Sequence, residues 1–484
     1  MSNLENKLKK IINKFNGLDK ENAYIEIKNL SQKYKKNLNV QNILSQIAIN
    51  MGDIDTAISA LKNILFIERN NSTALNTIYK LLIHKKEFDE ALNYINFLVK
   101  TDKDNYEAKR DKLYIYYLKK NFSKAIKYIQ DELVLKIDDY FGINISGLIY
   151  LKLNDFNKAK KCFEKSIKIN KEYIDAYNNL GTCLIELEKL DQAEEIFTNA
   201  YKINRNNLTT LINLGNVNSL RDNVDNAINF YNKALVFDSN NSEVYSNLAI
   251  LYCRQDNEEM AKLYFDKAIK INPNDNKLKY AYSTLNLKLN NFKKSWELFD
   301  SRLLIEKNKQ KLKNFNLIKN TLFSDLLINS KEKILVLREQ GIGEEVLFSS
   351  IYEEIINKFD NIKIEADKRL VPIFNRSFKK KIFVDEGYIS NTDKVNEFDK
   401  FVYAGSLLKL FRKNINDFNN KNYLLADKDL IKVYEEKLSI HKKKLKVGIS
   451  WKSVVNIYGN LKSLSIKDFE PLFNKDRIII NLQY

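Results

Sequence analysis

A small residue returns at a constant interval of about 34 residues through the first two thirds of this chain, and no other feature restricts its possible folds so strongly. The members of the series are Ala23, Ala57, Ala91, Ala125, Ala159, Ala193, Ala227, Ala261 and Ser295. A fixed period of this length predicts a stack of helix–turn–helix units, each too small to bury its apolar face alone. We expect the small residue to lie where the two helices of a unit cross, because a larger side chain would push them apart.

Two further sets of residues keep the same register. Gly147, Gly181 and Gly215 recur at the same interval, with Ala249 next, and predict a close approach in the first helix of each unit. An aromatic residue follows the small residue of the second helix by four, on the same helix face. These aromatic residues are Phe163, Phe197, Tyr231, Phe265 and Phe299.

The pattern resembles the tetratricopeptide repeat, whose signature is a period of about 34 residues with small residues at these places. The resemblance covers about residues 4–309 in nine units, of which the first four keep the alanine but are degenerate at the glycine and aromatic places. It implies an α-solenoid, a right-handed superhelix with a concave groove that binds extended peptides or helices. The expected partner is therefore a protein or peptide in the repeat groove.

Three asparagines suggest how such a groove would hold its partner. Asn179, Asn213 and Asn247 are separated by the repeat interval and stand at a place that faces the groove in this family. They resemble the asparagine ladder of O-linked N-acetylglucosamine transferases, in which stacked amides bind a peptide backbone of any sequence, since each amide supplies donors and an acceptor. The alternative is that asparagine is simply common at this place in tetratricopeptide repeats.

After residue 309 the period stops, and short apolar runs alternate with helical stretches. Strands are predicted at residues 333–338, 362–365, 382–385, 401–404, 446–451 and 478–482. A helix is predicted at residues 465–473, opened by a Ser465 cap with Asp468 three residues on. Strands that alternate with helices predict a parallel, doubly wound sheet.

The loop after the first of these strands is the one place where the sequence favours chemistry. Gly341 and Gly343 open a helix there, but Val346 stands where a dinucleotide fingerprint needs a third glycine, and no Gly-Lys-Ser/Thr run exists. Binding of NAD or ATP is therefore not expected. Glu344 and Glu345 either only favour the helix dipole or provide a carboxylate at the mouth of the sheet, where a general base would lie.

The run from Glu339 to Glu344 resembles the Glu-Gln-Gly-Leu-Gly-Asp motif of bacterial proteins that join tetratricopeptide repeats to a glycosyltransferase domain. That domain is similar to heptosyltransferases and has the two-Rossmann GT-B fold. The resemblance implies that Glu344 is the base for the acceptor hydroxyl, although the family has the shorter aspartate there. It also implies that Gly341 and Gly343 shape the acceptor loop, and that Lys452 or Lys462 faces the diphosphate of a sugar-nucleotide donor.

The resemblance also divides the chain into expected domains. Residues 4–309 form the repeat superhelix, 310–440 the N-terminal Rossmann-like half of a GT-B domain, and 441–484 the start of its donor-binding half. Because the family continues for well over a hundred residues, we expect a truncated domain that is inactive alone. Two functions stay open: a repeat scaffold that recruits a protein or glycan acceptor to a sugar transferase, or a non-catalytic scaffold with a remnant domain.

Composition excludes several other classes of function. The net charge of +18 is spread along the chain and interleaved with acids, whereas nucleic-acid binding needs a concentrated basic stripe. Two histidines and three cysteines without a CxxC exclude a histidine-rich metal site and favour buried structural thiols. With no apolar run of about 20 residues and no signal peptide, we expect a soluble, cytoplasmic protein without a membrane span, metal or cofactor.

Overall fold

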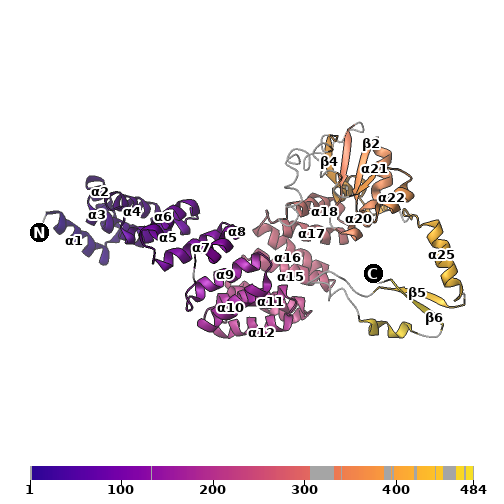
Figure 1. The fold of residues 1–484 in the computed structure, drawn as a ribbon, viewed down its shortest axis with the longest axis horizontal. Helices are drawn as coiled ribbons and strands as arrows, with labels where there is room; N and C mark the ends of the chain where they lie inside the picture. Colours follow the sequence, from indigo (N-terminus) through magenta and orange to yellow (C-terminus); the bar gives the residue numbers. More distant parts are fainter. Residues whose placement is uncertain are drawn as a thin grey trace. The chain divides into compact units, whose positions relative to one another are not determined.

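The structure is a computed structural model, and it describes residues 3–131, 133, 135–305, 332–339, 341–385, 388, 394, 397–418, 422–441, 443–450, 465–473 and 476–482. The chain forms two compact units, residues 1–205 and 206–484, and each is described by itself. Figure 1 labels their helices and strands.

The first unit is a series of helices of nearly equal length, in which consecutive helices pack as pairs (Figure 1). They are α1 (Asn3–Asn16), α2 (Lys20–Lys33), α3 (Leu38–Asn50), α4 (Ile54–Ile67), α5 (Ser72–His84), α6 (Phe88–Thr101), α7 (Tyr106–Leu118), α8 (Phe122–Asp131), α9 (Tyr140–Lys152), α10 (Phe156–Ile169), α11 (Ile174–Glu186) and α12 (Leu190–Ile203).

The second unit opens with further helix pairs. These are α13 (Leu208–Leu220), α14 (Val224–Phe237), α15 (Ser242–Arg254), α16 (Glu258–Ile271), α17 (Asn276–Lys288) and α18 (Phe292–Phe299), with the 3-10 helix η1 (Asp300–Leu304) after them. The α-solenoid predicted from the repeat period is confirmed in both units. The proposed boundary at residue 309 lies outside the described residues, and the three domain ranges stay predictions.

The part of the second unit in which strands and helices alternate contains two parallel sheets among the described residues. The strands β1 (Lys333–Leu337), β2 (Asn361–Ala366), β3 (Phe383–Asp385) and β4 (Lys400–Tyr403) form a sheet in the order β3-β2-β1-β4. The strands β5 (Leu445–Ile449) and β6 (Arg477–Asn481) form a separate parallel pair. This is a small α/β region with parallel sheets, as the alternation predicted.

Short helices connect these strands. They are α20 (Ile342–Phe348), η3 (Ser349–Ile351), α21 (Tyr352–Lys358), α22 (Val371–Phe378), α24 (Ala404–Phe411), η5 (Ile415–Asp417), α25 (Lys428–Ser439) and η7 (Ile466–Leu472). Two predictions need correction: Ala404 begins α24 rather than ending a strand, and the segment after Ser465 is a 3-10 helix. The predicted cap is confirmed, since Ser465 and Asp468 form a capping box.

The register of small residues is explained by packing between the two helices of each repeat. Every member of the alanine series is fully buried, and the hydroxyl of Ser295 donates to the carbonyl oxygen of Ser283 at 2.8 Å. The three register glycines each face the aromatic ring of the second helix. A Cβ added to Gly147, Gly181 or Gly215 would come within 3.0 Å of the ring of Phe163, Phe197 or Tyr231, respectively.

The turn between the two helices of a repeat has a left-handed residue that the sequence did not reveal. The backbone φ is 77° at Gly52 and lies between 54° and 64° at the equivalent residues, which are Lys86, Lys120, Asn154, Glu188, Asp222, Asp256 and Asn290. At Glu188 the amide donates to Ile185, and the next amide donates to Leu184, each at 2.9 Å. This is a Schellman motif, which normally uses glycine at the left-handed position.

The last repeat packs directly into the core of the α/β region. Phe292, Trp296 and Phe299 of α18 belong to the hydrophobic cluster that contains the buried face of the sheet. The indole Nε1 of Trp296 donates to the carbonyl oxygen of Arg412 at 2.5 Å. The last repeat and the four-stranded sheet therefore share one core.

Candidate peptide groove and sheet-edge loop

The three predicted groove asparagines occupy equivalent places on first helices. Asn179 lies on α11, Asn213 on α13 and Asn247 on α15, and each side chain is half-buried. The leucine that follows each of them is buried in the core. Helical geometry therefore places these amides at the border between the core and the surface of the repeat.

Two of these amides are held by an asparagine of the preceding repeat. In the first unit, Nδ2 of Asn179 donates to Oδ1 of Asn144 at 3.0 Å. In the second unit, Nδ2 of Asn247 donates to Oδ1 of Asn216 at 3.0 Å, and Asn216 also accepts from the hydroxyl of Tyr231 at 2.6 Å. Sequence reasoning missed Asn144 and Asn216, because neither shares the register of the three predicted residues.

The segment from Glu339 to Glu345 leads from β1 into the first turn of α20, and we call it the sheet-edge loop. Gly341 is the N-cap of this helix, and its amide donates to Oε2 of Glu344 at 3.2 Å, so the Glu344 side chain does support the helix start. Glu344 and Gly343 are both exposed. A Cβ on Gly343 would meet no atom within 4 Å, so packing does not require glycine there.

The other two acids of this loop are structural. Glu339 lies two residues after β1 with its carboxylate buried, where it binds Arg302 and accepts from the amide of Gly405 at 2.7 Å. Glu345 is buried one residue beyond Glu344, and it accepts from Nε of Arg338 at 2.7 Å. The loop thus separates two internal carboxylates from one that faces solvent.

The electrostatics of the buried groups follow from their surroundings. Burial raises the pKa of Glu345, although the Asp367 amide and the Arg338 guanidinium oppose this shift. Burial alone would also raise the pKa of Asp300, but the Ser406 hydrogen bond and the Arg302 charge bring it below its ordinary value. Asp300 therefore stays charged inside the junction between the repeats and the sheet.

The remaining candidate residues are either outside the described residues or inert. Lys452 and Lys462, the predicted donor-binding lysines, lie outside the residues that the structure describes. Burial raises the pKa of the Cys162 and Cys183 thiols to about 11, so neither is an activated nucleophile. Within the described ranges, no group of three or more histidine, cysteine or acidic side chains is arranged to hold a metal ion.

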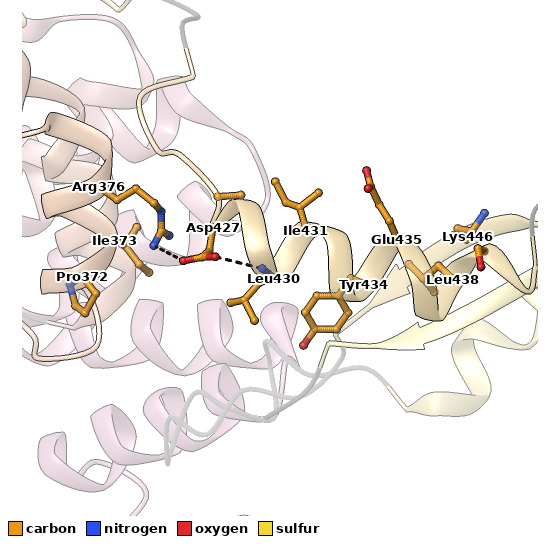
Figure 2. Close-up of a pocket in the computed structure, with 12 residues that line it drawn as sticks. Pro372, Ile373, Arg376, Asp427, Leu430, Ile431, Tyr434, Glu435, Leu438 and Lys446 are labelled. Carbon is orange, nitrogen blue, oxygen red and sulfur yellow. Dashed lines mark hydrogen bonds and ion pairs between the residues drawn. The ribbon is translucent and has the colours of Figure 1, made fainter.

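A second surface feature lies away from the loop, along α25. An open groove of about 960 Å³ is lined by residues of α22 and α25, of the segment before α25, and by Lys446. Figure 2 shows how the lining residues lie, with Leu430 and Tyr434 on the same side of α25. The ion pair between Arg376 and Asp427, at 3.3 Å, holds the two helices together at one end. None of the predicted site residues lines this groove.

Comparisons with known proteins identify the repeats. Three models of the tetratricopeptide repeat match residues 144–173, 172–237 and 242–275. These residues are tetratricopeptide repeats. The matched ranges contain the three asparagines predicted to face the groove and end before the α/β region. No curated protein matches the sequence.

Three solved structures match parts of this chain at low sequence identity. The APC/C hetero-tetramer Cut9-Hcn1 is 15% identical, with a TM-score of 0.43, over 55% of this chain and 52% of that one. YrrB, described as a tetratricopeptide-repeat protein with an unusual peptide-binding site, is 20% identical, with a TM-score of 0.26, over 48% and 98%. MamA is 21% identical, with a TM-score of 0.30, over 35% and 97%. In the described part of the chain, no helix is both long enough and apolar enough to span a membrane.

Proposed function

We propose that this protein is a binding scaffold whose tetratricopeptide repeats hold an extended peptide segment of a partner protein. The observation that carries the proposal is the pairing of the asparagine amides. Asn179 and Asn247 each use one N–H to bind a neighbouring asparagine, which fixes the direction of the amide. Among the residues that the structure describes, neither amide has a partner for its second N–H or its Oδ1, so both groups can bind a ligand.

Such amides suit the backbone of a peptide rather than a particular side chain. A peptide bond offers one donor and one acceptor, and an asparagine amide complements both. Asn213 occupies the equivalent place on α13, so that the three residues are separated by the repeat interval in the sequence. The partner would be extended and tolerant of sequence, with its specificity set by other contacts.

The test is a triple substitution with a matched control. A peptide is first selected from a random displayed library on the wild-type chain, then synthesised with a fluorescent label. Substitution of Asn179, Asn213 and Asn247 by alanine should weaken its binding at least ten-fold, since each lost hydrogen bond costs about 0.5–1.5 kcal/mol.

The control replaces Asn226, Asn229 and Asn232 of α14, which are exposed on a second helix, by alanine. This control removes the same number of amides, and its affinity for the peptide should stay within two-fold of that of the wild-type chain. Equal binding by both triple variants would remove the asparagine ladder from the proposal. Circular dichroism must show the same helical content in all three proteins.

A second candidate function is sugar transfer by the α/β region, as the resemblance to GT-B glycosyltransferases implies. The observation in its favour is the different exposure of the three acids of the loop. Glu339 and Glu345 are buried, whereas Glu344 faces solvent. The absence of a packing need for Gly343 also supports it, because a missing Cβ lets a ligand approach the helix start. Glu344 would accept the proton of the acceptor hydroxyl, and Lys452 or Lys462 would face the donor diphosphate.

This candidate is tested on the full gene product. Calorimetry with sugar-nucleotides should detect binding, and Glu344→Gln should abolish transfer while leaving donor binding unchanged. Glu353→Gln, which changes an exposed acid of α21, is the control and should stay active. If no sugar-nucleotide binds, the transferase function is wrong and the scaffold function is unaffected.

A further inference from the structure

A recess in the second unit lies where the last repeat meets the α/β region. We call it the junction recess, and its volume is about 800 Å³. It is lined by Asn276, Lys279, Lys293, Trp296, Glu297, Asp300, Ser301, Leu304, Lys409 and Lys413. These residues come from α17, α18, η1 and α24, together with the residues that follow α24.

Four of the ten lining residues are lysines, and most of their charge is not neutralised locally. Lys409 forms an ion pair with Asp300 at 3.1 Å, and Asp300 is also bound by the buried Arg302. Lys279, Lys293 and Lys413 form no ion pair with any carboxylate in the described part of the chain. Glu297 is the one other acid of the lining, so the recess presents a net positive charge.

Other lysines on the surface of the repeats do have acidic partners. Lys85 binds Asp55 of the preceding repeat at 2.6 Å, and Lys288, which belongs to the last repeat itself, binds Asp256 of the preceding repeat at 2.5 Å. These two pairs link neighbouring repeats across their surface. In the described part of the chain, Lys279, Lys293 and Lys413 lack such partners, although they line one concave site where their charges reinforce one another.

The shape and lining of the recess favour a peptide over a compact phosphate. The cations are flexible lysines on three segments, whereas a compact phosphate is best held by an arginine fork or by free amides at a helix start. The first amides of α17 are already taken, because Asp275 accepts from the Lys277 and Leu278 amides. Trp296 and Leu304 add apolar surface between the charges.

We propose that the junction recess binds an acidic peptide segment, in which spaced carboxylates pair with Lys279, Lys293 and Lys413 and an apolar side chain packs against Leu304, beside Trp296. This site is separate from the asparagine groove and does not depend on it. It would let one partner contact both the repeats and the face of the α/β region.

The experiment measures binding of a labelled, disordered peptide of glutamate pairs separated by leucines to the full chain, by fluorescence anisotropy. A peptide with glutamine for every glutamate should not bind. The triple variant Lys279→Ala, Lys293→Ala and Lys413→Ala should weaken binding about ten-fold or more, since each exposed ion pair contributes roughly two- to five-fold. In a chain with Trp451→Phe, Trp296 is the one remaining tryptophan. Its fluorescence emission should change when the peptide binds, and should not change when the three recess lysines are also replaced.

The matched control removes the same charge elsewhere, with Lys262→Ala and Lys270→Ala on α16 and Lys277→Ala on α17, none of which lines the recess. Equal losses in the two triple variants would mean unspecific attraction to a basic protein and would overturn the proposal. Saturable binding of pyrophosphate at these lysines without binding of the acidic peptide would also overturn it. The asparagine triple variant should bind the acidic peptide normally, so that failure of one site is distinguishable from failure of the other.

Discussion

Arg302 and Glu339 form a double hydrogen bond inside the second unit, from Nε to Oε2 and from Nη2 to Oε1, each at 2.8 Å. Arg302 is fully buried directly after the last repeat, and Glu339 is 5% exposed, two residues after β1. The pair therefore ties the repeat to the strand that precedes the sheet-edge loop. Gly405 allows this approach, because a Cβ there would lie 2.8 Å from Arg302 and from Glu339.

Removing one partner of this pair should strongly lower the free energy of unfolding. Arg302→Met leaves the Glu339 carboxylate buried without its cation, and we expect a loss of about 3–5 kcal/mol in the free energy of unfolding. The double variant Arg302→Met with Glu339→Gln should regain more than half of that loss, because no charge is then left alone. Urea denaturation of the two variants measures both effects.

The control for this prediction is Arg376→Met, which breaks the partly exposed pair with Asp427. It should cost less than about 1 kcal/mol. A loss of similar size in Arg302→Met would show that the buried pair does not hold the junction together.

The close contact between Gly181 and Phe197 predicts a second stability effect. Gly181→Ala places a methyl group against the Phe197 ring and should cost about 1–3 kcal/mol through overpacking. Adding Phe197→Leu to this variant should recover part of the loss, since the smaller side chain leaves room. Thr182→Ala on the same helix is the control and should change stability by under about 1 kcal/mol. If the rescue variant is no more stable than Gly181→Ala, the ring is not the cause.

The left-handed turn residues predict a stabilising substitution. Glu188 has a φ of 59°, which costs a non-glycine residue about 1–2 kcal/mol, while glycine loses roughly 0.5–1 kcal/mol more entropy on folding. Glu188→Gly should therefore gain about 0.5–1 kcal/mol, measured as a rise in the thermal midpoint. The reciprocal substitution Gly52→Ala should lower the midpoint, and a fall in both variants would contradict this account.

Asp53 predicts a change of stability with pH in the first unit. The Tyr24 hydroxyl, at 2.5 Å, and the Thr56 amide lower the pKa of Asp53 from 3.8 to about 2. Because the folded pKa is depressed, the stabilisation is complete above pH 3.8 and is lost as the pH falls towards 2. We expect about 1 kcal/mol at neutral pH, since the carboxylate is partly exposed and screened.

The measurement compares urea midpoints of the wild type and Asp53→Asn across this range of pH. The difference between the two proteins should be constant at neutral pH and should shrink below pH 3.8. A difference that does not depend on pH would mean that the Asp53 charge contributes nothing to folding.

The repeat fold could be predicted because its cause is local and periodic. The alanine and glycine positions predicted where the helices approach closely, and the spacing of the aromatic residues placed them on the same helix face as the small residues. Only the structure shows that their rings pack against the register glycines. The left-handed turns could not be predicted, because lysine, asparagine, glutamate and aspartate stand where a glycine signal was expected. Their conformation is imposed by the packing of the two helices rather than by the residue.

The candidate site was less accessible to sequence reasoning. The pattern placed Glu344 and Glu345 together at the helix start, but only the phase of α20 decides that Glu345 is buried against Arg338 and Glu344 is not. The asparagine pairs depend on the distance between neighbouring first helices. The junction recess depends on contacts between α18 and α24, whose residues lie more than a hundred positions apart in the chain.

The shared core at Trp296 also determines where this protein can be divided. A repeat array normally ends in a unit with a polar outer face, which keeps its last apolar side chains from water. Here Phe292, Trp296 and Phe299 are instead covered by the α/β region and are each at most 9% exposed. A fragment cut directly after α18 would present these three rings to solvent and aggregate, so a soluble repeat fragment has to end before α17.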